Sequence, residues 1–346
     1  MRAVFAVTGG GVSALSRLLA EAGASATVLD ARIPYSAAAL EIFLGGRVEG
    51  SASERTARAM AMAAFMEARQ FDDSFEVAGI ACTAAIATNR TRRGSDRAHL
   101  AIQTADRTAV TTVEFERASR AEQEAQCRDL VLQVTAAAAG LEGADALDWT
   151  LARPEWSELL RGERAHTSNA SPDLVLSGSF NPIHAGHLRM ASVAQRLTGV
   201  QPTLEISAFN VDKPPIDYLE FATRDAQPRG GLELTFTNAP TFIEKARVFR
   251  GATFIVGVDT ITRIGAPRYY GGATGLTTAL EELAALGTRF LVFGRQDQKR
   301  FLTLDDVDLP DSLRDMCTGV SEQDFRVDVS STELRAQQAY TNGQTP

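Results

Sequence analysis

Apolar residues in the first half of the chain recur either three to four positions apart or in short runs. The helical spacing, filled mostly by alanine, leucine and methionine, predicts helices over 13–22, 54–69 and 120–139, the last with Ser119 as its N-cap. Short runs rich in β-branched and aromatic residues predict strands over 75–81 and 109–115, and a further short strand just before Thr8.

In the second half, short apolar runs alternate with helical patterns. The runs predict strands over 174–177, 203–208, 232–236, 253–258 and 289–293. A helix is expected from about His187 to Leu197, soon after the first of these strands. Alternation of strands and helices is typical of parallel sheets, so we expect an α/β fold with parallel sheets in both halves.

Composition changes near residue 150 of the 346-residue chain, which is long enough for two domains. No lysine precedes that point, and Lys213, Lys245 and Lys299 all follow it. A polar stretch with both tryptophans and a short helical pattern lies at the change. We therefore predict a first domain over 1–145, a linker with a short helix over 146–172 and a second domain over 173–346.

The protein is acidic, with 35 Lys plus Arg against 43 Asp plus Glu and a formal net charge of −8. Nucleic-acid and membrane-surface binders need a basic face, so these partner classes are not expected. Cys82, Cys127 and Cys317 show neither a disulfide framework nor zinc-ligand spacing. With no secretory leader and no apolar run of about 18 residues, we expect a cytoplasmic protein.

The most informative stretch follows the strand at 174–177 and reads Gly-Ser-Phe-Asn-Pro-Ile-His-Ala-Gly-His, from Gly178 to His187. A strand that ends in a glycine-containing turn and opens a helix offers backbone N–H groups and the positive end of the helix dipole to an anion. Gly186 has no side chain to block a nucleotide, and His184 and His187 flank it. This pattern predicts a phosphate site.

A second anion site is predicted far downstream, at Val-Ser-Ser-Thr-Glu-Leu-Arg. Ser330, Ser331 and Thr332 open a helix, and Arg335 ends its first turn. One triphosphate carries more negative charge than a single helix N-terminus can neutralise. We therefore expect Arg335 to approach the same ligand as His184.

Together the two motifs resemble those of the cytidylyltransferase-like nucleotidyltransferases, and among them the nicotinamide/nicotinate mononucleotide adenylyltransferases, over about 173–345. The resemblance implies a Rossmann-like parallel sheet and transfer of AMP from ATP to a mononucleotide phosphate, with Mg²⁺ bridging the phosphates and pyrophosphate released. It implies catalytic roles for His184, His187 and Arg335. The residues it implies in binding are Gly178, Ser179, Phe180, Asn181, Gly186, Lys213, Asp259, Ser330, Ser331 and Thr332. No protein residue is assigned to the metal.

Some of these assignments have structural alternatives. Asp259, in the Gly-x-Asp segment after the strand at 253–258, is expected near the ribose or the metal, or else as a helix cap. Lys213 contacts a phosphate or is a solvated surface residue. The family commonly has a tryptophan after Gly-x-Asp, whereas this chain offers Tyr269 and Tyr270 as substitutes in a pyridine pocket.

The first half resembles the C-terminal domain of the competence-damage-inducible proteins, whose active members are nicotinamide mononucleotide deamidases. The resemblance rests on the glycine loop Thr8-Gly-Gly-Gly, on Pro34-Tyr-Ser and on the segment 78–84. It implies an α/β deamidase-like domain over about 1–140.

This half departs from the family at the residues that carry the chemistry. Ala6 replaces the nucleophilic serine, and Leu40 stands where a lysine is expected. An amide hydrolase without nucleophile and base has no route to its reaction, unless Ser13 or Ser36 substitutes. We expect a degenerate domain that is kept for dimerisation or for binding a nucleotide.

The sequence thus predicts an adenylyltransferase that uses ATP and Mg²⁺ on a small phosphorylated acceptor, as a homo-oligomer without nucleic-acid or membrane partners. Two alternatives stay open. One is another adenylyl or cytidylyl transfer, such as transfer to pantetheine phosphate. The other is a non-catalytic nucleotide-binding scaffold.

Overall fold

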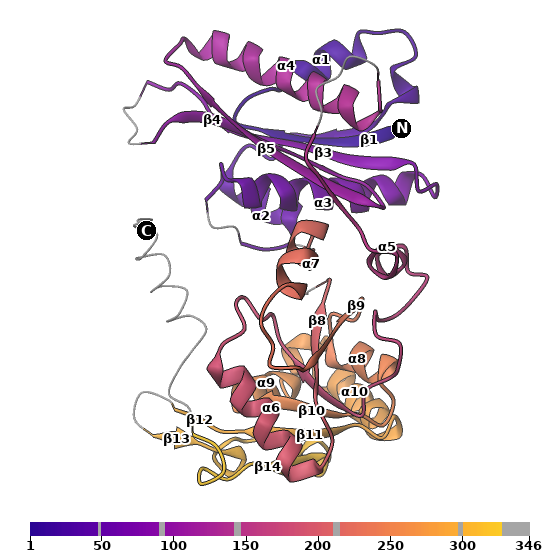
Figure 1. Ribbon diagram of the computed structural model, residues 1–346, viewed down its shortest axis with the longest axis vertical. Coiled ribbons are helices and arrows are strands. Elements are labelled where there is room, and N and C mark those ends of the chain that lie inside the picture. The colour runs from indigo at the N-terminus through magenta and orange to yellow at the C-terminus, as the bar shows by residue number, and fades with distance from the viewer. Residues whose placement is uncertain (48–49, 90–93, 142–146, 210–214, 297–299, 327–346) are drawn as a thin grey trace. The chain divides into compact units, whose positions relative to one another are not determined.

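The computed structural model describes residues 1–47, 50–89, 94–141, 147–209, 215–296 and 300–326. The chain divides into two compact units, drawn as ribbons in Figure 1. The first unit comprises Met1–Glu163 and Phe209–Ala222, and the second comprises Arg164–Ala208 and Thr223–Pro346.

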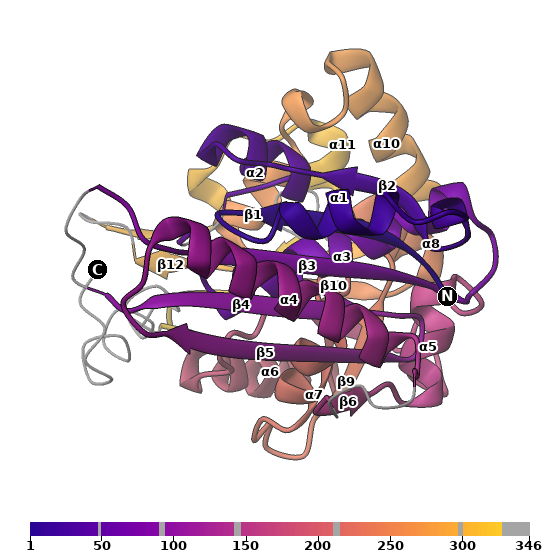
Figure 2. The same cartoon turned by 90° about the horizontal axis from the view of Figure 1, so that it is seen from above.

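The first unit is a six-stranded sheet in the order β2-β1-β3-β4-β5-β6, with helices on both faces. Its strands are β1 (Arg2–Thr8), β2 (Val28–Arg32), β3 (Val77–Ala85), β4 (Asp96–Gln103), β5 (Arg107–Phe115) and β6 (Trp149–Leu151). Its helices are α1 (Ser13–Leu19), α2 (Ala37–Leu44), α3 (Glu54–Phe71), α4 (Arg120–Ala138) and α5 (Pro154–Arg161), with a 3₁₀ turn at Ala24–Ala26. Helices α1 and α4 cover one face and α2 and α3 the other (Figure 1), and Figure 2 shows β1, β3, β4 and β5 running side by side.

This first sheet is mixed, so the expectation of a parallel sheet in the first half is wrong for part of it. Strand β1 pairs in parallel with β2 and with β3. The pairs β3–β4, β4–β5 and β5–β6 are antiparallel. The reason is the short connection between β4 and β5, where Thr104 N–H donates to the carbonyl of Arg107 at 2.9 Å. So tight a turn reverses the chain, and a parallel pair needs a much longer crossover.

Helix α3 packs unusually close to the sheet, at Gly79 of β3. A Cβ atom on Gly79 would lie 2.0 Å from the carbonyl oxygen of Ala61. Only glycine allows this approach, which buries the alanine-rich face of the helix against the strand. The predicted N-cap of α4 is confirmed, since Ser119 and Glu122 form a capping box.

The compact units do not follow the predicted domain boundaries. Strand β6 and helix α5 lie inside the predicted linker and belong to the first unit, as does the stretch Phe209–Ala222 from the predicted second domain. In that stretch Tyr218 and Phe221 are fully buried, and the Tyr218 hydroxyl donates to Ala105 O at 2.6 Å. Asp217 forms a buried ion pair with Arg58 at 2.9 Å. The sequence pattern of Phe209–Ala222 indicates that its apolar side chains are buried, but it does not indicate which of the two units contains the core that buries them.

The second unit is a six-stranded, fully parallel sheet in the order β14-β11-β10-β7-β8-β9. Its strands are β7 (Leu174–Ser177), β8 (Thr203–Ser207), β9 (Glu233–Thr237), β10 (Thr253–Gly257), β11 (Arg289–Phe293) and β14 (Cys317–Gly319), besides a small hairpin of β12 (Arg295–Gln296) and β13 (Phe301–Leu302). Its helices are α6 (Ala185–Thr198), α8 (Phe242–Val248), α9 (Val258–Ile264), α10 (Ala273–Ala285) and α11 (Asp311–Arg314), with 3₁₀ turns at Pro267–Tyr269 and Leu304–Asp306. Helix α7 (Tyr218–Asp225) contains the boundary between the units.

This strand order is the Rossmann order, with β7 and β10 side by side in the middle of the sheet. The chain runs outward from β7 on one side and from β10 on the other, so the switch point lies between these two strands. Ligands of such sheets bind beyond the carboxyl ends of the strands at this point. The expected α/β architecture with a Rossmann-like second half is therefore confirmed. No described helix is long and apolar enough to cross a membrane.

Candidate functional site

The turn between β7 and α6 lies at the switch point and has an uncommon backbone shape. The N–H of Gly178 donates to the carbonyl of Glu205 on β8 at 3.0 Å. Phe180 has a φ of 41°, in the left-handed region, and only 1% of it is exposed. A Cβ on Gly178 would lie 3.0 Å from the Phe180 ring, so the glycine makes room for that ring. The turn buries Phe180 and leaves Ser179 exposed.

His184 and His187 cap the start of α6 reciprocally. The Nδ1 atom of His184 accepts the N–H of Gly186 at 3.1 Å, and the N–H of His184 donates to Nδ1 of His187 at 3.3 Å. Their rings stack with centroids 3.7 Å apart, and the His187 ring meets the Phe180 ring edge-on at 4.9 Å. The helix begins at Ala185 rather than at the predicted His187, because His184 is the N-cap.

These bonds determine which nitrogen of each ring carries the proton. A neutral imidazole has one donor and one acceptor nitrogen, and Nδ1 is the acceptor in both rings. The proton of each ring therefore resides on Nε2. Burial lowers the pKa of both histidines, and the pKa of His187 falls to about 4 because His184 also opposes a second charge. Near pH 7 the pair is a set of neutral hydrogen-bond donors rather than a pair of cations.

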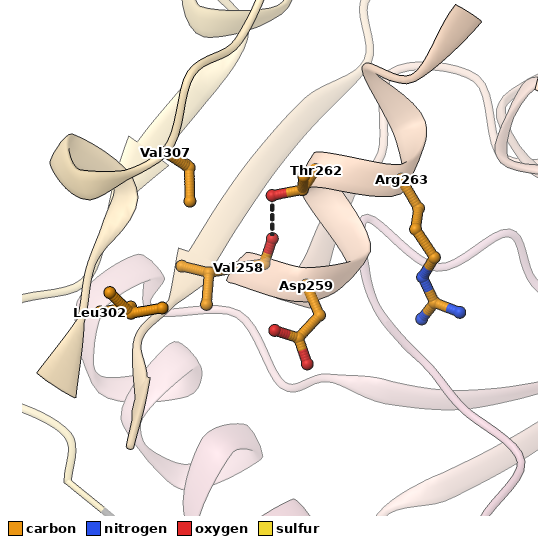
Figure 3. A pocket seen from close by; sticks show the side chains of 6 residues that line it. All are labelled: Val258, Asp259, Thr262, Arg263, Leu302 and Val307. Carbon is orange, nitrogen blue, oxygen red and sulfur yellow. Dashed lines mark hydrogen bonds between the residues drawn. The ribbon is translucent and has the colours of Figure 1, made fainter. Parts of the chain in front are cut away.

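Asp259 lies in the first turn of α9, directly after the neighbouring strand β10. The N-cap of α9 is Gly257, so the capping alternative for Asp259 is wrong. Its carboxylate forms an ion pair with Arg295, and both side chains are about half exposed. Asp259 also lines a pocket of about 520 Å³ with Val258, Thr262, Arg263, Leu302 and Val307 (Figure 3).

The structure thus brings most of the first motif and Asp259 to the ends of adjacent strands. The motif residues that share the turn and the start of α6 are Gly178, Ser179, Phe180, Asn181, His184, Gly186 and His187. Five predicted site residues lie outside the described residues: Lys213, Ser330, Ser331, Thr332 and Arg335. The meeting of the two motifs around one ligand therefore stays a prediction.

The two tyrosines that follow α9 differ in their surroundings. Tyr270 packs against the core of the second unit, and burial raises the pKa of its hydroxyl. Tyr269 is 45% exposed, and the guanidinium of Arg268 lies 4.8 Å from its ring centroid. Of the pair, only Tyr269 has the exposure that stacking on a ligand ring requires.

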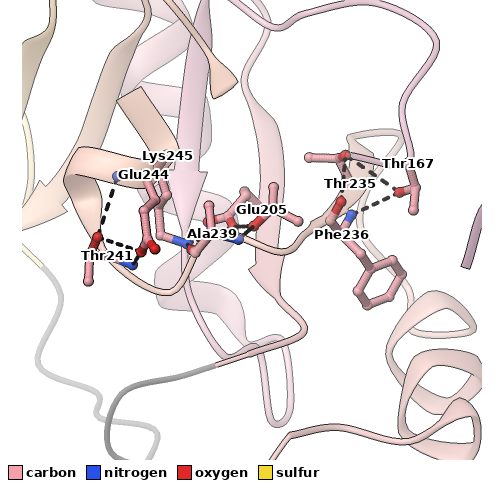
Figure 4. A network of polar contacts seen from close by, with 9 residues as sticks. Thr167, Glu205, Thr235, Phe236, Ala239, Thr241, Glu244 and Lys245 are labelled. Carbon is pink, nitrogen blue, oxygen red and sulfur yellow. Dashed lines mark hydrogen bonds and ion pairs between the residues drawn. The ribbon is translucent and has the colours of Figure 1, made fainter. Parts of the chain in front are cut away.

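The second unit also contains a buried ion pair that the sequence patterns did not predict. Lys245 of α8 donates to Glu205 of β8 at 2.7 Å and to the carbonyl of Ala239 at 2.9 Å (Figure 4). The Thr237 hydroxyl donates to the same carboxylate. The side chains of Glu205 and Lys245 are 1% and 7% exposed. Removing one partner of such a pair typically costs about 3–5 kcal/mol, because it leaves a buried charge uncompensated. The single charge within the apolar strand 203–208 was the available signal.

In the first unit, Ser13 and Ser36 are the two candidate substitutes for the missing nucleophile, and both hydroxyl groups form local hydrogen bonds. Ala6 lies on β1 and is fully buried. Ser36 is the N-cap of α2, and its hydroxyl accepts the N–H of Ala39 at 3.1 Å. The hydroxyl of Ser13 donates to Glu124 Oε1 at 3.1 Å. Both candidate substitutes therefore serve the local structure.

The glycine loop of this unit is occupied by the chain itself. Glu124 of α4 accepts the N–H of Gly11 through Oε2 and the N–H of Ser13 through Oε1, the latter at 3.0 Å. These are the backbone donors that an anion would otherwise use. The side chain of Arg120 binds the carbonyls of Gly9 and Ala87 at 3.3 and 3.0 Å. The loop is thus closed by internal contacts.

Comparison with known proteins agrees with the resemblance of the second half. The model of the cytidylyltransferase-like family matches residues 175–224, from β7 through α6 and β8 into α7. This match supports a nucleotidyltransferase as the general class of the second unit. No curated protein is significantly similar to the chain.

Among the solved structures that match the chain are competence-damage proteins, the family that the first half resembles. A competence or damage-inducible protein from Enterobacter asburiae is 18% identical, covers 40% of this chain and 87% of its own, and has a TM-score of 0.33. A CinA superfamily protein from Enterobacter cloacae is 19% identical, with coverages of 40% and 82% and a TM-score of 0.34. The protein CihA from Agrobacterium tumefaciens is 21% identical, with coverages of 38% and 83% and a TM-score of 0.31.

Proposed function

We propose that the second unit transfers AMP from ATP to the phosphate of a small acceptor, with nicotinamide or nicotinate mononucleotide as the preferred acceptor. The observation that carries this proposal is the neutral His184–His187 pair at the N-cap of α6, at the switch point of a Rossmann-ordered sheet. The family match at 175–224 supports the same reaction class.

In the proposed reaction, a phosphate oxygen of the acceptor attacks the α-phosphorus of the nucleotide. The bond from that phosphorus to the oxygen bridging the β-phosphate breaks, and pyrophosphate leaves with both electrons. No proton has to move when the phosphates are ionised, so the protein acts by positioning and by stabilising charge. The Nε2–H donor of His187 suits this task, because a neutral ring held by backbone and ring contacts with His184 needs no reorganisation as charge grows on the phosphate oxygens.

We further propose that Mg²⁺ arrives with the nucleotide. Within them, no group of three or more His, Cys, Asp or Glu side chains is arranged to hold a metal ion, and Asp259 is paired with Arg295. Mg²⁺ at such sites is bound mainly by substrate phosphates with one or two carboxylates, and it neutralises part of their charge. Asp259 is the carboxylate that would reach it.

The remaining proposed contacts concern the two ends of the substrates. Ser330, Ser331, Thr332 and Arg335 bind the β- and γ-phosphates, and Lys213 binds a phosphate as well. Tyr269, the more exposed of the two tyrosines after α9, stacks on the pyridine ring of the acceptor.

The test is pyrophosphate release with ATP or CTP against nicotinamide mononucleotide, nicotinate mononucleotide and pantetheine phosphate. CTP is included because the matching family is cytidylyltransferase-like. We expect release with ATP and a pyridine mononucleotide, and its loss in His187→Ala. Pyrophosphate release only with CTP would assign cytidylyl transfer to the unit instead. Release only with pantetheine phosphate would assign transfer to that acceptor. Binding of ATP without release for any acceptor would instead make the unit a nucleotide-binding scaffold.

A further inference from the structure

Side chains at the end of α7 and just after it form hydrogen bonds to the turn that carries the histidines. None of the sequence motifs includes these residues. Gln227 lies just after α7, within the second unit. Its Nε2 donates to the carbonyl of Phe180 at 2.9 Å, and its Oε1 accepts the N–H of Ile183 at 2.7 Å. A single side-chain amide therefore spans Asn181 and Pro182 and joins both sides of the turn.

The two backbone groups that Gln227 binds are those that place the histidines. Ile183 directly precedes the N-cap His184, and Phe180 packs its ring edge against His187. Phe180 also has a left-handed φ of 41°. Residues other than glycine adopt this backbone conformation only when the surrounding structure imposes it. The bond from Gln227 to the Phe180 carbonyl is one such constraint.

Arg224 adds a second brace from the same segment. This residue is 7% exposed, and its guanidinium donates to Oδ1 of Asn181 at 2.9 Å. Together, Arg224 and Gln227 bind three groups of the turn, the Phe180 carbonyl, the Asn181 side chain and the Ile183 N–H. Both bonds of the Gln227 side chain go to the backbone, so Gln227 acts on the histidines through the backbone that carries them.

We propose that Gln227 is a positioning residue of the nucleotidyl-transfer site, and that it holds the His184–His187 cap in the tautomer in which Nδ1 of each ring accepts a backbone N–H group. This inference rests on the proposed function for its catalytic consequence. Its structural part, the control of the histidine cap, stands independently of the substrate.

The experiment compares Gln227→Ala and Gln227→Glu with the control Gln201→Ala. Gln201 also bonds a backbone carbonyl by its side chain, that of Gly231 at 3.2 Å, but it lies before β8 and away from the turn. We expect Gln227→Ala to lower kcat about 10- to 100-fold, with the KM for ATP changed less than about threefold. Gln227→Glu keeps the acceptor for Ile183 N–H and loses the donor to Phe180, so we expect an intermediate kcat. Gln201→Ala should match the wild type.

The second measurement is independent of any substrate. Nitrogen-15 NMR of the imidazoles distinguishes the two neutral tautomers, and the chain has only four histidines to assign. We expect His184 and His187 to show the Nε2–H form in the wild type and a mixture of tautomers in Gln227→Ala. Thermal unfolding of each variant shows whether it is folded. If Gln227→Ala is not folded, Gln227→Glu tests the positioning role instead, because it preserves the volume of the side chain.

The outcomes separate the two proposals. Wild-type kcat and unchanged histidine signals in a folded Gln227 variant would overturn the positioning role while leaving the proposed function intact. Absence of transfer by the wild type with every nucleotide and acceptor would overturn the proposed function, and the NMR result would still decide whether Gln227 controls the cap. Equal losses of kcat in Gln227→Ala and Gln201→Ala would also count against a specific role.

Discussion

Each unit has a glycine-containing turn between its first strand and the helix that follows, and the two turns differ in what binds their backbone donors. In the first unit, the N–H groups of Gly11 and Ser13 are bound by the carboxylate of Glu124. In the second unit, the N–H groups of His184 and Gly186 are bound by neutral imidazoles.

The charge of the internal partner distinguishes the two turns as possible anion sites. In the first turn, the Glu124 carboxylate accepts both N–H groups and already supplies a negative charge. An anionic ligand would have to displace this carboxylate to bind the same donors. A neutral imidazole satisfies the same kind of donor through Nδ1 without adding a negative charge. The first turn is therefore a structural contact, and the second is the one to which we assign phosphate binding in the proposed function.

The strongest test of this comparison is His187→Ala. It removes a preorganised donor, and we expect turnover to fall about 10²- to 10³-fold. The measurement is pyrophosphate release at saturating ATP. His166→Ala, which removes a half-buried histidine elsewhere in the unit, is the control. Near-wild-type turnover in His187→Ala would remove the proposed site.

The equivalent test in the first unit is Glu124→Ala. It leaves two backbone N–H groups and the Ser13 hydroxyl without their acceptor, so we expect the free energy of unfolding to fall by about 2–3 kcal/mol. Urea unfolding measures this loss. Glu21→Ala, at an exposed glutamate of the same unit, should change it by less than about 0.5 kcal/mol. Equal stability of the two variants would show that the carboxylate is not what closes the loop.

Arg335→Ala tests whether the downstream motif belongs to the second turn. We expect ATP binding to weaken by about 1.5–3 kcal/mol, the scale of a charge-assisted hydrogen bond, and binding of the acceptor to change much less. Arg335→Lys should rescue only partly, since a point charge does not reproduce the guanidinium fork. Calorimetric titration with ATP measures both. Unaltered ATP binding by Arg335→Ala would mean that the two motifs do not form one site.

The histidine cap also predicts a dependence of stability on pH. The pKa of His187 is about 4 in the folded protein, against 6.5 for an unperturbed histidine. Between these values the unfolded chain binds the proton and the folded one does not, so the stabilisation is complete above pH 6.5 and declines as the pH falls towards 4. For a partly exposed ring this amounts to about 1–2 kcal/mol. Urea unfolding of the wild type and His187→Gln at neutral and acidic pH should show a smaller decline in the variant.

The smallest effects are expected at the serines of the first unit. Ser36→Ala removes the N-cap of α2 and should lower the free energy of unfolding by about 1 kcal/mol. It should not alter ammonia release from nicotinamide mononucleotide, because the wild type should release none at a useful rate. Ammonia release that disappears in Ser13→Ala or Ser36→Ala would contradict the interpretation of this unit as degenerate.

Local patterns predicted most of the second unit. Strand 174–177 and strand 289–293 have the bounds expected, since apolar runs of this length, closed by polar or glycine residues, have few other structures open to them. The glycine and histidine motif was recognisable because its residues are contiguous. The mixed sheet of the first unit was less accessible, because β4 begins with Asp96 and Arg97 and its partners are set by a tight turn rather than by its own pattern.

The α/β class, the position of the turn with glycine and histidine, and Ala6 in place of a serine were predictable from local patterns, because each depends on neighbouring residues. Three other features depend on contacts between distant segments: Glu124 fills the first turn, Gln227 bonds to the second, and Tyr218 is buried in the first unit. These partners lie 113, 44 and 113 residues apart. The physical reason is that a lone Glu, Gln or Tyr has the same local signature on a solvated surface as in a buried contact, and only the packing of distant segments distinguishes the two.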